Sequence, residues 1–317
     1  MVRRQLTRRQ MLLAGMAGLG SLVAARDLRG SPSSGAAAAA AAGTLTIGGD
    51  LTVNRMGFGA MRLTGEGIWG EPKDLAEARR VLRRAVDLGV NFIDTADAYG
   101  PEVNERLIAE TLHPYPRGLV IATKGGQTRP SAGQWVPDGR PEHLREACEG
   151  SLKRLKLERI DLYQFHWPDP KVPVEDSVGE LARLRTEGKI RHVGVSNFSA
   201  DELQRVRQIV PIVSVQNRYN VADRASEDVL TVCTREGIAF IPWAPLARGS
   251  VEKLVSDGLE AVAKQHAASV FQVAIAWLLA KSPVMLPIPG TSSVAHVEEN
   301  VAAARLKFGA EDLARLG

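Results

Sequence analysis

The chain has 317 residues, of which 44% are apolar and 24% are charged, a composition typical of a globular protein with a sizeable core. Its net charge is +4, but the first thirty residues hold six arginines and one aspartate, so residues 31–317 together carry −1. A nearly neutral body offers no basic surface to nucleic acid, which excludes that class of partner.

The first thirty residues are typical of an export signal. Thr7-Arg8-Arg9-Gln10-Met11-Leu12-Leu13 resembles the twin-arginine motif, and an apolar Gly/Ala-rich run follows to residue 25. This run is shorter than the roughly 20 residues that a membrane span needs, so it predicts a signal segment over residues 1–30 and no stable membrane anchor. The expected location is exported, periplasmic or extracellular, through the twin-arginine machinery. A cytoplasmic location is the alternative if the signal is inefficient.

Residues 31–43 are rich in Ala, Ser and Gly and predict a flexible linker without a face to bury. Residues 44–317 then form the folded domain. Two short apolar runs, 44–47 and 51–53, flank Gly48-Gly49-Asp50, which predicts an N-terminal β-hairpin.

Strand-like and helix-like segments alternate after the hairpin. Eight strand–helix pairs follow one another over about 260 residues, and many of the strands are continuous apolar runs, as in a parallel sheet buried on both faces. This pattern predicts the α/β class, as a closed (β/α)8 TIM barrel. The expected strands are residues 56–61, 90–93, 119–123, 161–165, 192–195, 212–216, 239–243 and 285–288.

A dinucleotide-binding fingerprint competes with this interpretation. Gly65-Glu66-Gly67-Ile68-Trp69-Gly70 matches GxGxxG, follows a strand, and is followed 24 residues later by Asp94. However, Glu71-Pro72 separates the last glycine from the next helix, whereas a true fingerprint opens that helix at the pyrophosphate. The spacing therefore argues against a Rossmann fold.

Ionisable groups stand at the ends of successive predicted strands. Asp94 and Tyr99 follow the second strand, Lys124 the third and His166 the fourth. In a barrel the carboxyl ends of the strands meet at one mouth, so these four side chains are expected to form an acid–base site. Trp69, Trp135 and Trp167 stand on mouth loops, as walls of a substrate pocket or as loop anchors.

From residue 44 to about residue 308 the chain resembles the aldo-keto reductases. The resemblance rests on Asp94-Thr95-Ala96-Asp97-Ala98-Tyr99-Gly100, Thr123-Lys124-Gly125, Gly194-Val195-Ser196-Asn197-Phe198 and Ile288-Pro289-Gly290-Thr291-Ser292, and on the stretch from Asp161 to Asp169. It implies reduction of an aldehyde or ketone, or oxidation of the alcohol, with NAD(P)H. The family's catalytic tetrad falls on Asp94, Tyr99, Lys124 and His166.

The resemblance gives each member of the tetrad a role. Tyr99 would donate a proton to the carbonyl oxygen, and a nearby Lys124 ammonium is expected to lower the pKa of its hydroxyl. Asp94 would hold Lys124 in place. His166 would hydrogen-bond the substrate oxygen or the Tyr99 hydroxyl. No metal is needed for this chemistry, and no side chains have metal-ligand spacing.

The resemblance also implies the cofactor contacts. NADP(H) is expected first and NAD(H) is possible, because His296 stands where many NADPH-dependent members have an arginine, and Gly290 where the family has a lysine. Ser196, Asn197 and Gln216 would bind the nicotinamide amide, and Trp243 would stack on the ring. The remaining expected contacts are Pro245, Leu246, Arg248 and Gly249 along the pyrophosphate, and Gly290, Thr291, Ser292, His296, Glu299 and Asn300 around the adenosine.

Two other functions stay open on the sequence alone. A redox-sensing regulatory subunit on the same fold would bind the cofactor but turn over little. A metal-dependent barrel hydrolase is the third hypothesis, which the lack of ligand spacing disfavours.

Overall fold

The computed structural model describes residues 37–250 and 256–317 of the chain. The predicted signal segment, residues 1–30, and the first part of the predicted linker lie outside the described residues. The strands of the main sheet are all parallel and follow the order β11-β10-β9-β8-β5-β4-β3. Their bounds are β3 Phe58–Gly59, β4 Phe92–Asp94, β5 Val120–Gly125, β8 Ile160–Phe165, β9 Ile190–Ser196, β10 Ile212–Gln216 and β11 Ala239–Phe240.

Residues 285–289 connect the two edges of this sheet. The Leu286 N–H donates to the Phe240 carbonyl at 2.9 Å on the β11 side, and the Gly57 N–H donates to the Pro287 carbonyl at 3.0 Å beside β3. Only the Phe240–Met285 pair has regular bridge geometry here, so the expected eighth strand is reduced to a single bridge. With this closure, the predicted α/β fold of (β/α)8 type is confirmed.

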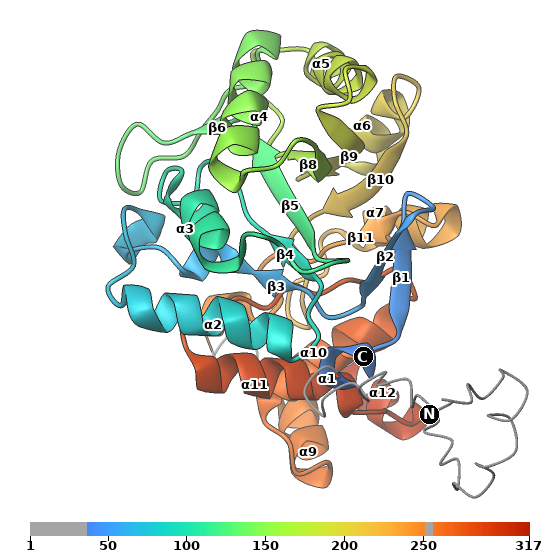
Figure 1. The fold of residues 1–317 in the computed structure, drawn as a ribbon. Coiled ribbons are helices and arrows are strands. Elements are labelled where there is room, and N and C mark those ends of the chain that lie inside the picture. The colour runs from blue at the N-terminus through green and yellow to red at the C-terminus, as the bar shows by residue number, and fades with distance from the viewer. Residues whose placement is uncertain (1–36, 251–255) are drawn as a thin grey trace, which may run out of the picture. The chain divides into compact units, whose positions relative to one another are not determined.

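Helices lie outside the strands (Figure 1). In α2 (Leu75–Asp87) the Asp74 side chain caps the Glu77 N–H, and the buried residues Ala78, Val81, Leu82 and Ala85 recur at helical spacing. The bounds of the other main helices are α3 Val103–Leu112, α4 Pro141–Leu155, α5 Val174–Thr186, α6 Ala200–Val206, α7 Glu227–Glu236, α9 Asp257–Gln265, α10 Val270–Lys281, α11 Val294–Ala302 and α12 Ala310–Leu316. None of the helices in residues 37–250 and 256–317 has the length and apolarity that crossing a bilayer requires.

The segment before the barrel pairs β1 (Thr44–Ile47) with β2 (Leu51–Asn54) in antiparallel register. In the turn between them, Asp50 contacts Arg191 at 2.7 Å and His192 at 2.6 Å, at the start of β9. Ile47, Leu51 and Val53 are buried. The pair therefore covers the amino ends of the strands and leaves the carboxyl ends open.

Two local features differ from the sequence expectations. Ala37–Ala40 form a short helix, α1, whose Ala38 and Ala39 are buried in the core beside α11. The end of the predicted linker is thus part of the folded body, because its alanines do find an apolar surface. After β5, the short strands β6 (Gln127–Thr128) and β7 (Val136–Pro137) form a hairpin that the sequence analysis did not anticipate.

Candidate active site

The four predicted catalytic side chains converge at the carboxyl ends of the strands. Asp94 is the last residue of β4, Lys124 lies on β5, His166 follows β8 and Tyr99 lies in the turn after β4. The Lys124 ammonium donates to Asp94 Oδ1 at 2.6 Å, to the Thr95 carbonyl at 2.8 Å and to the Tyr99 hydroxyl at 3.3 Å. A single ammonium group therefore joins the carboxylate to the phenol.

Lys124 is fully buried, so its charge depends on these three partners. Burial alone would lower the pKa of its ammonium, but the Asp94 carboxylate and the Tyr99 hydroxyl raise it above its ordinary value. Because all three partners are acceptors within hydrogen-bond reach, Lys124 is both charged and fixed in position.

Two glutamines hold the second oxygen of Asp94. Gln216 Nε2 donates to Asp94 Oδ2 at 2.8 Å, and Gln164 Nε2 donates to the same oxygen at 3.2 Å. Gln216 was expected to contact the nicotinamide; it lines the cavity, and its amide nitrogen also holds Asp94. The sequence analysis did not identify Gln164 as a contact of Asp94. The available signal was a polar glutamine inside the largely buried strand β8.

The pKa of the Tyr99 hydroxyl differs in direction from the expectation. Burial raises this pKa, the Lys124 ammonium opposes the effect, and the Asp94 carboxylate adds to it, so the net shift is upward. The sequence analysis considered only Lys124. Tyr99 is thus protonated at neutral pH, as a proton donor must be.

His166 faces Tyr99 as a neutral imidazole. The two rings lie 5.8 Å apart between centroids in an edge-to-face arrangement. Burial lowers the pKa of His166 well below its ordinary value, and the positive charges of Lys124 and Arg129 lower it further. Its Nδ1 atom is buried without a hydrogen-bond partner in the described structure, which leaves polar capacity for a ligand.

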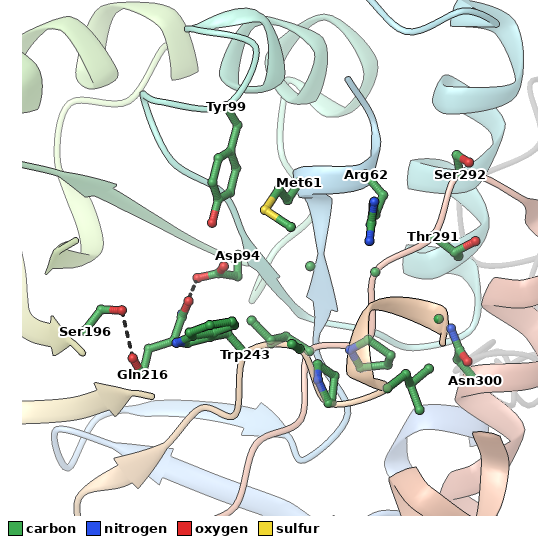
Figure 2. A pocket seen from close by; sticks show the side chains of 18 of the residues that line it. Met61, Arg62, Asp94, Tyr99, Ser196, Gln216, Trp243, Thr291, Ser292 and Asn300 are labelled. Carbon is green, nitrogen blue, oxygen red and sulfur yellow. Dashed lines mark hydrogen bonds between the residues drawn. The ribbon is translucent and has the colours of Figure 1, made fainter. Parts of the chain in front are cut away.

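A large cavity opens from this site. It has a volume of about 1020 Å³ and extends from Tyr99 and His166 to Asn300. Figure 2 shows Tyr99, Asp94 and Gln216 at one end and Thr291, Ser292 and Asn300 at the other, with Trp243 between them. This volume is at the upper end of the range for drug-sized ligands, so the cavity fits a dinucleotide together with a small substrate.

The middle of the cavity is an ordered polar network. Trp243 Nε1 donates to Asn197 Oδ1 at 2.9 Å, and the Asn197 amide donates to the His166 carbonyl at 3.1 Å. Ser196 Oγ donates to the Gln216 carbonyl at 2.7 Å. These contacts hold the Trp243 ring at the cavity wall, where a planar ring of a ligand can stack on it.

The end of the cavity far from Tyr99 lies at the amino terminus of α11. Gly290 approaches β3 so closely that a Cβ there would collide with the Gly59 carbonyl, which explains why no lysine can stand at this position. Thr291 Oγ1 lies 3.4 Å from His296 Nδ1. The first N–H of α11, on Val294, already donates to Glu77 at 3.0 Å. Hydroxyls, an imidazole and the remaining N–H groups are thus available to a phosphate.

The cavity contains most of the residues expected from the sequence and several that were missed. Pro245, Leu246, Gly249, Glu299 and Asn300 line it, whereas the side chain of Arg248 lies outside the described residues. The lining residues that the sequence analysis did not identify are Gly59, Met61, Arg62, Gln127, Pro137, Ala244, Phe271, Ile288 and Pro289. No three His, Cys, Asp or Glu side chains gather as a metal site in the described part of the chain.

We expect the neutral His166 to make the fold sensitive to acid. The unfolded chain binds a proton at this residue below about pH 6.5, whereas the folded state resists it, so stability is lost as the pH falls through that value. Between pH 7.5 and 5.5 this one proton accounts for about 1.4 kcal/mol of unfolding free energy. Urea denaturation at both pH values should show a pH-dependent loss smaller by that amount in His166→Gln. Identical losses in both proteins would contradict the assignment.

Comparisons with known proteins give matches over most of the chain. A family model described as the aldo/keto reductase family matches residues 55–317. An uncharacterized oxidoreductase of Schizosaccharomyces pombe is 51% identical over 283 residues, which cover 89% of this chain and 92% of the relative. The pyridoxine 4-dehydrogenase of Escherichia coli is 41% identical over 280 residues, covering 86% and 96%. The solved structure of an aldo-keto reductase from Klebsiella pneumoniae in complex with NADPH is 26% identical, has a TM-score of 0.73, and is matched over 86% of this chain and 93% of that one.

Proposed function

Since the chain belongs to the aldo/keto reductase family, we propose that Tyr99, Lys124, Asp94 and His166 perform the proton chemistry of its reaction. Family membership makes the protein an oxidoreductase that uses a nicotinamide cofactor on a small carbonyl compound or its alcohol. The observation that carries the proposal is the Lys124 ammonium, which contacts both Asp94 and Tyr99 beside the cavity. Nothing in the comparisons supports the regulatory-subunit alternative.

In the proposed reaction Tyr99 is the general acid. Its hydroxyl transfers a proton to the carbonyl oxygen, and the Lys124 ammonium at 3.3 Å stabilises the phenolate that remains. Asp94 keeps Lys124 charged and in place. His166, which is neutral, donates a ring N–H to the same carbonyl oxygen and so orients the substrate. When bound, the reduced cofactor supplies the hydride for the carbonyl carbon.

The residues that line the cavity support a proposed position for the cofactor. We expect the nicotinamide to stack on Trp243, near Ser196 and Asn197, and the adenosine to lie by Glu299 and Asn300. Pro245, Leu246 and Gly249 would flank the pyrophosphate, with Arg248 as a further proposed contact. Gly290, Thr291 and Ser292 would meet the adenosine phosphate.

We expect NADPH to be preferred over NADH by about tenfold in kcat/KM, since one or two hydrogen bonds to a 2′-phosphate contribute about 1.4 kcal/mol. Thr291, Ser292 and His296 supply those bonds, but without a guanidinium at His296 the preference is modest. Steady-state kinetics with each cofactor measure the ratio. A clear preference for NADH would overturn this assignment.

The substrate class is proposed from the cavity wall and one relative. Trp135 and Trp167 line the cavity beside His166, and such walls suit a flat ring. The relative named pyridoxine 4-dehydrogenase suggests an aromatic ring aldehyde such as pyridoxal as a first test substrate. NADPH oxidation by the purified protein with pyridoxal, 4-nitrobenzaldehyde and propanal tests the proposed function. Absence of turnover with an extended carbonyl panel, with NADPH shown to bind, would refute it.

Export through the twin-arginine machinery remains a proposal from residues 7–13 alone. Cell fractionation should find the protein outside the cytoplasm, and Arg8→Lys with Arg9→Lys should retain it inside. An unchanged cytoplasmic distribution of both forms would favour the cytoplasmic alternative.

A further inference from the structure

Arg129 is a buried guanidinium beside the substrate end of the cavity. It lies in the loop of the β6–β7 hairpin, directly after β6, and only 8% of its surface is exposed. Its Nε donates to the Gln134 carbonyl at 2.9 Å, and Nη1 donates to the carbonyls of Ile68 at 3.0 Å and Ala98 at 3.2 Å. Its Nη2 donates to the Gly67 carbonyl at 3.1 Å. One side chain thus ties together three separate loops.

The hydrogen-bond acceptors of Arg129 are all backbone carbonyls. Within residues 37–250 and 256–317, no carboxylate forms an ion pair with it, although burying a charge without a counter-ion is costly. A guanidinium offers five N–H groups in a rigid plane, which a lysine cannot reproduce. The geometry therefore requires arginine at this position for reasons beyond charge.

Arg129 also supports an aromatic wall of the cavity. Its guanidinium carbon lies 3.6 Å from the centroid of the Trp135 ring, a stacked cation–π contact. The Trp135 ring also meets both Tyr99 and His166 edge-to-face, each at 6.3 Å between centroids. Trp135 therefore contacts both Arg129 and two of the proposed catalytic residues.

The loop that Arg129 holds contains the GxGxxG-like motif, residues 65–70. Gly67 and Ile68, whose carbonyls Arg129 binds, have φ angles of 67° and 58°, a left-handed conformation that is strained for isoleucine. The loop continues through Gly70, whose N–H donates to the Gly100 carbonyl at 2.8 Å beside Tyr99. Helix α2 begins only at Leu75. The motif is thus a mouth loop, and its glycines serve the turn that presents two carbonyls to Arg129.

We propose that Arg129 is a positioning and specificity residue, which ties Trp135 to the loop 65–70 and so makes the Trp135 ring a rigid wall that selects flat aromatic carbonyl substrates. The substrate part of this inference rests on the proposed function, whereas the rigid wall does not. The positive charge of Arg129 also disfavours protonation of His166, which keeps that imidazole in its neutral form.

The kinetic test compares Arg129→Met and Arg129→Lys with the control Arg140→Met. Arg140 is an exposed arginine at the start of α4 that pairs with Asp138 outside the cavity. With NADPH, both Arg129 variants should lose roughly tenfold or more in kcat/KM for 4-nitrobenzaldehyde, chiefly through KM, but under about threefold for propanal. The Kd of NADPH should stay within about twofold of that of the wild type in all proteins.

The variant Trp135→Leu extends the same kinetic test. It should change the ratio of the two aldehydes as Arg129→Met does, and combining both substitutions should add little, since they remove the same wall. An equal loss for both aldehydes, an unchanged ratio, or fully additive losses would overturn the specificity role.

An activity-independent readout separates this inference from the proposed function. Hydrogen–deuterium exchange of peptides covering residues 65–70 should speed up by roughly tenfold in Arg129→Met and in Arg129→Lys, but not in Arg140→Met. Unchanged exchange would overturn the proposal that Arg129 holds the loop 65–70, even if the enzyme is active. Faster exchange in a protein without carbonyl turnover would support the role of Arg129 in holding this loop, while refuting the proposed function.

Discussion

Replacing Tyr99 by phenylalanine is expected to lower kcat for carbonyl reduction by about 10²–10⁴-fold, the usual contribution of a positioned general acid. The substitution removes one hydroxyl from a ring that is 6% exposed, so packing is kept. The proposed cofactor contacts do not include this hydroxyl, so the Kd of NADPH should be unchanged. Stopped-flow absorbance gives the rate, and fluorescence titration gives the Kd.

Tyr115→Phe is the matched control for this experiment. The Tyr115 hydroxyl donates a part-buried hydrogen bond to the Leu155 carbonyl at 2.8 Å, and it lies outside the cavity. Its loss should cost about 1 kcal/mol of stability and leave kcat unaffected. If Tyr99→Phe kept kcat within about threefold of wild type, Tyr99 would not be the proton donor.

Lys124→Met is expected to destabilise the fold and to abolish turnover together. It leaves the Asp94 carboxylate buried without its ammonium partner, and breaking a buried pair in this way costs about 3–5 kcal/mol. It also removes the charge that stabilises the Tyr99 phenolate. Urea denaturation and steady-state kinetics on the same preparation measure both losses.

A double variant separates the two effects. Adding Asp94→Asn to Lys124→Met removes the unpaired charge, so a good part of the stability should return while turnover stays absent. Recovery of turnover in the double variant, or a stable and active Lys124→Met protein, would contradict the role of Lys124.

The fold was largely predictable because its strands are continuous apolar runs. The order of the parallel strands follows from the alternation of strands and helices. Residues 285–289 show the limit of this reasoning, since Pro287 and Pro289 lack N–H groups and restrict the eighth strand to one bridge. The burial of Ala38 and Ala39 depends on a surface of α11 that lies far along the chain, and no local pattern reports it.

The positions of the tetrad were predictable from the strand ends, but their electrostatics were not. The upward pKa shift of Tyr99 arises from burial, which a sequence does not display. The contacts of Gln164 and Gln216 with Asp94 join strands that are 70 and 122 residues away from it. Arg129 likewise contacts loops that only the closed barrel brings together, so its proposed role could not be predicted from the sequence around residue 129.

The most direct test of the central claim follows the transferred hydrogen. Wild-type protein is incubated with NADPH deuterated at the transferring C4 position and with an aromatic aldehyde such as 4-nitrobenzaldehyde or pyridoxal, and the product is analysed by mass spectrometry and NMR. The account predicts an alcohol with one deuterium on the carbinol carbon in the wild type, and at most traces of it in Tyr99→Phe over the same time. Bound NADPH with no deuterated alcohol from any carbonyl compound in the panel would contradict it.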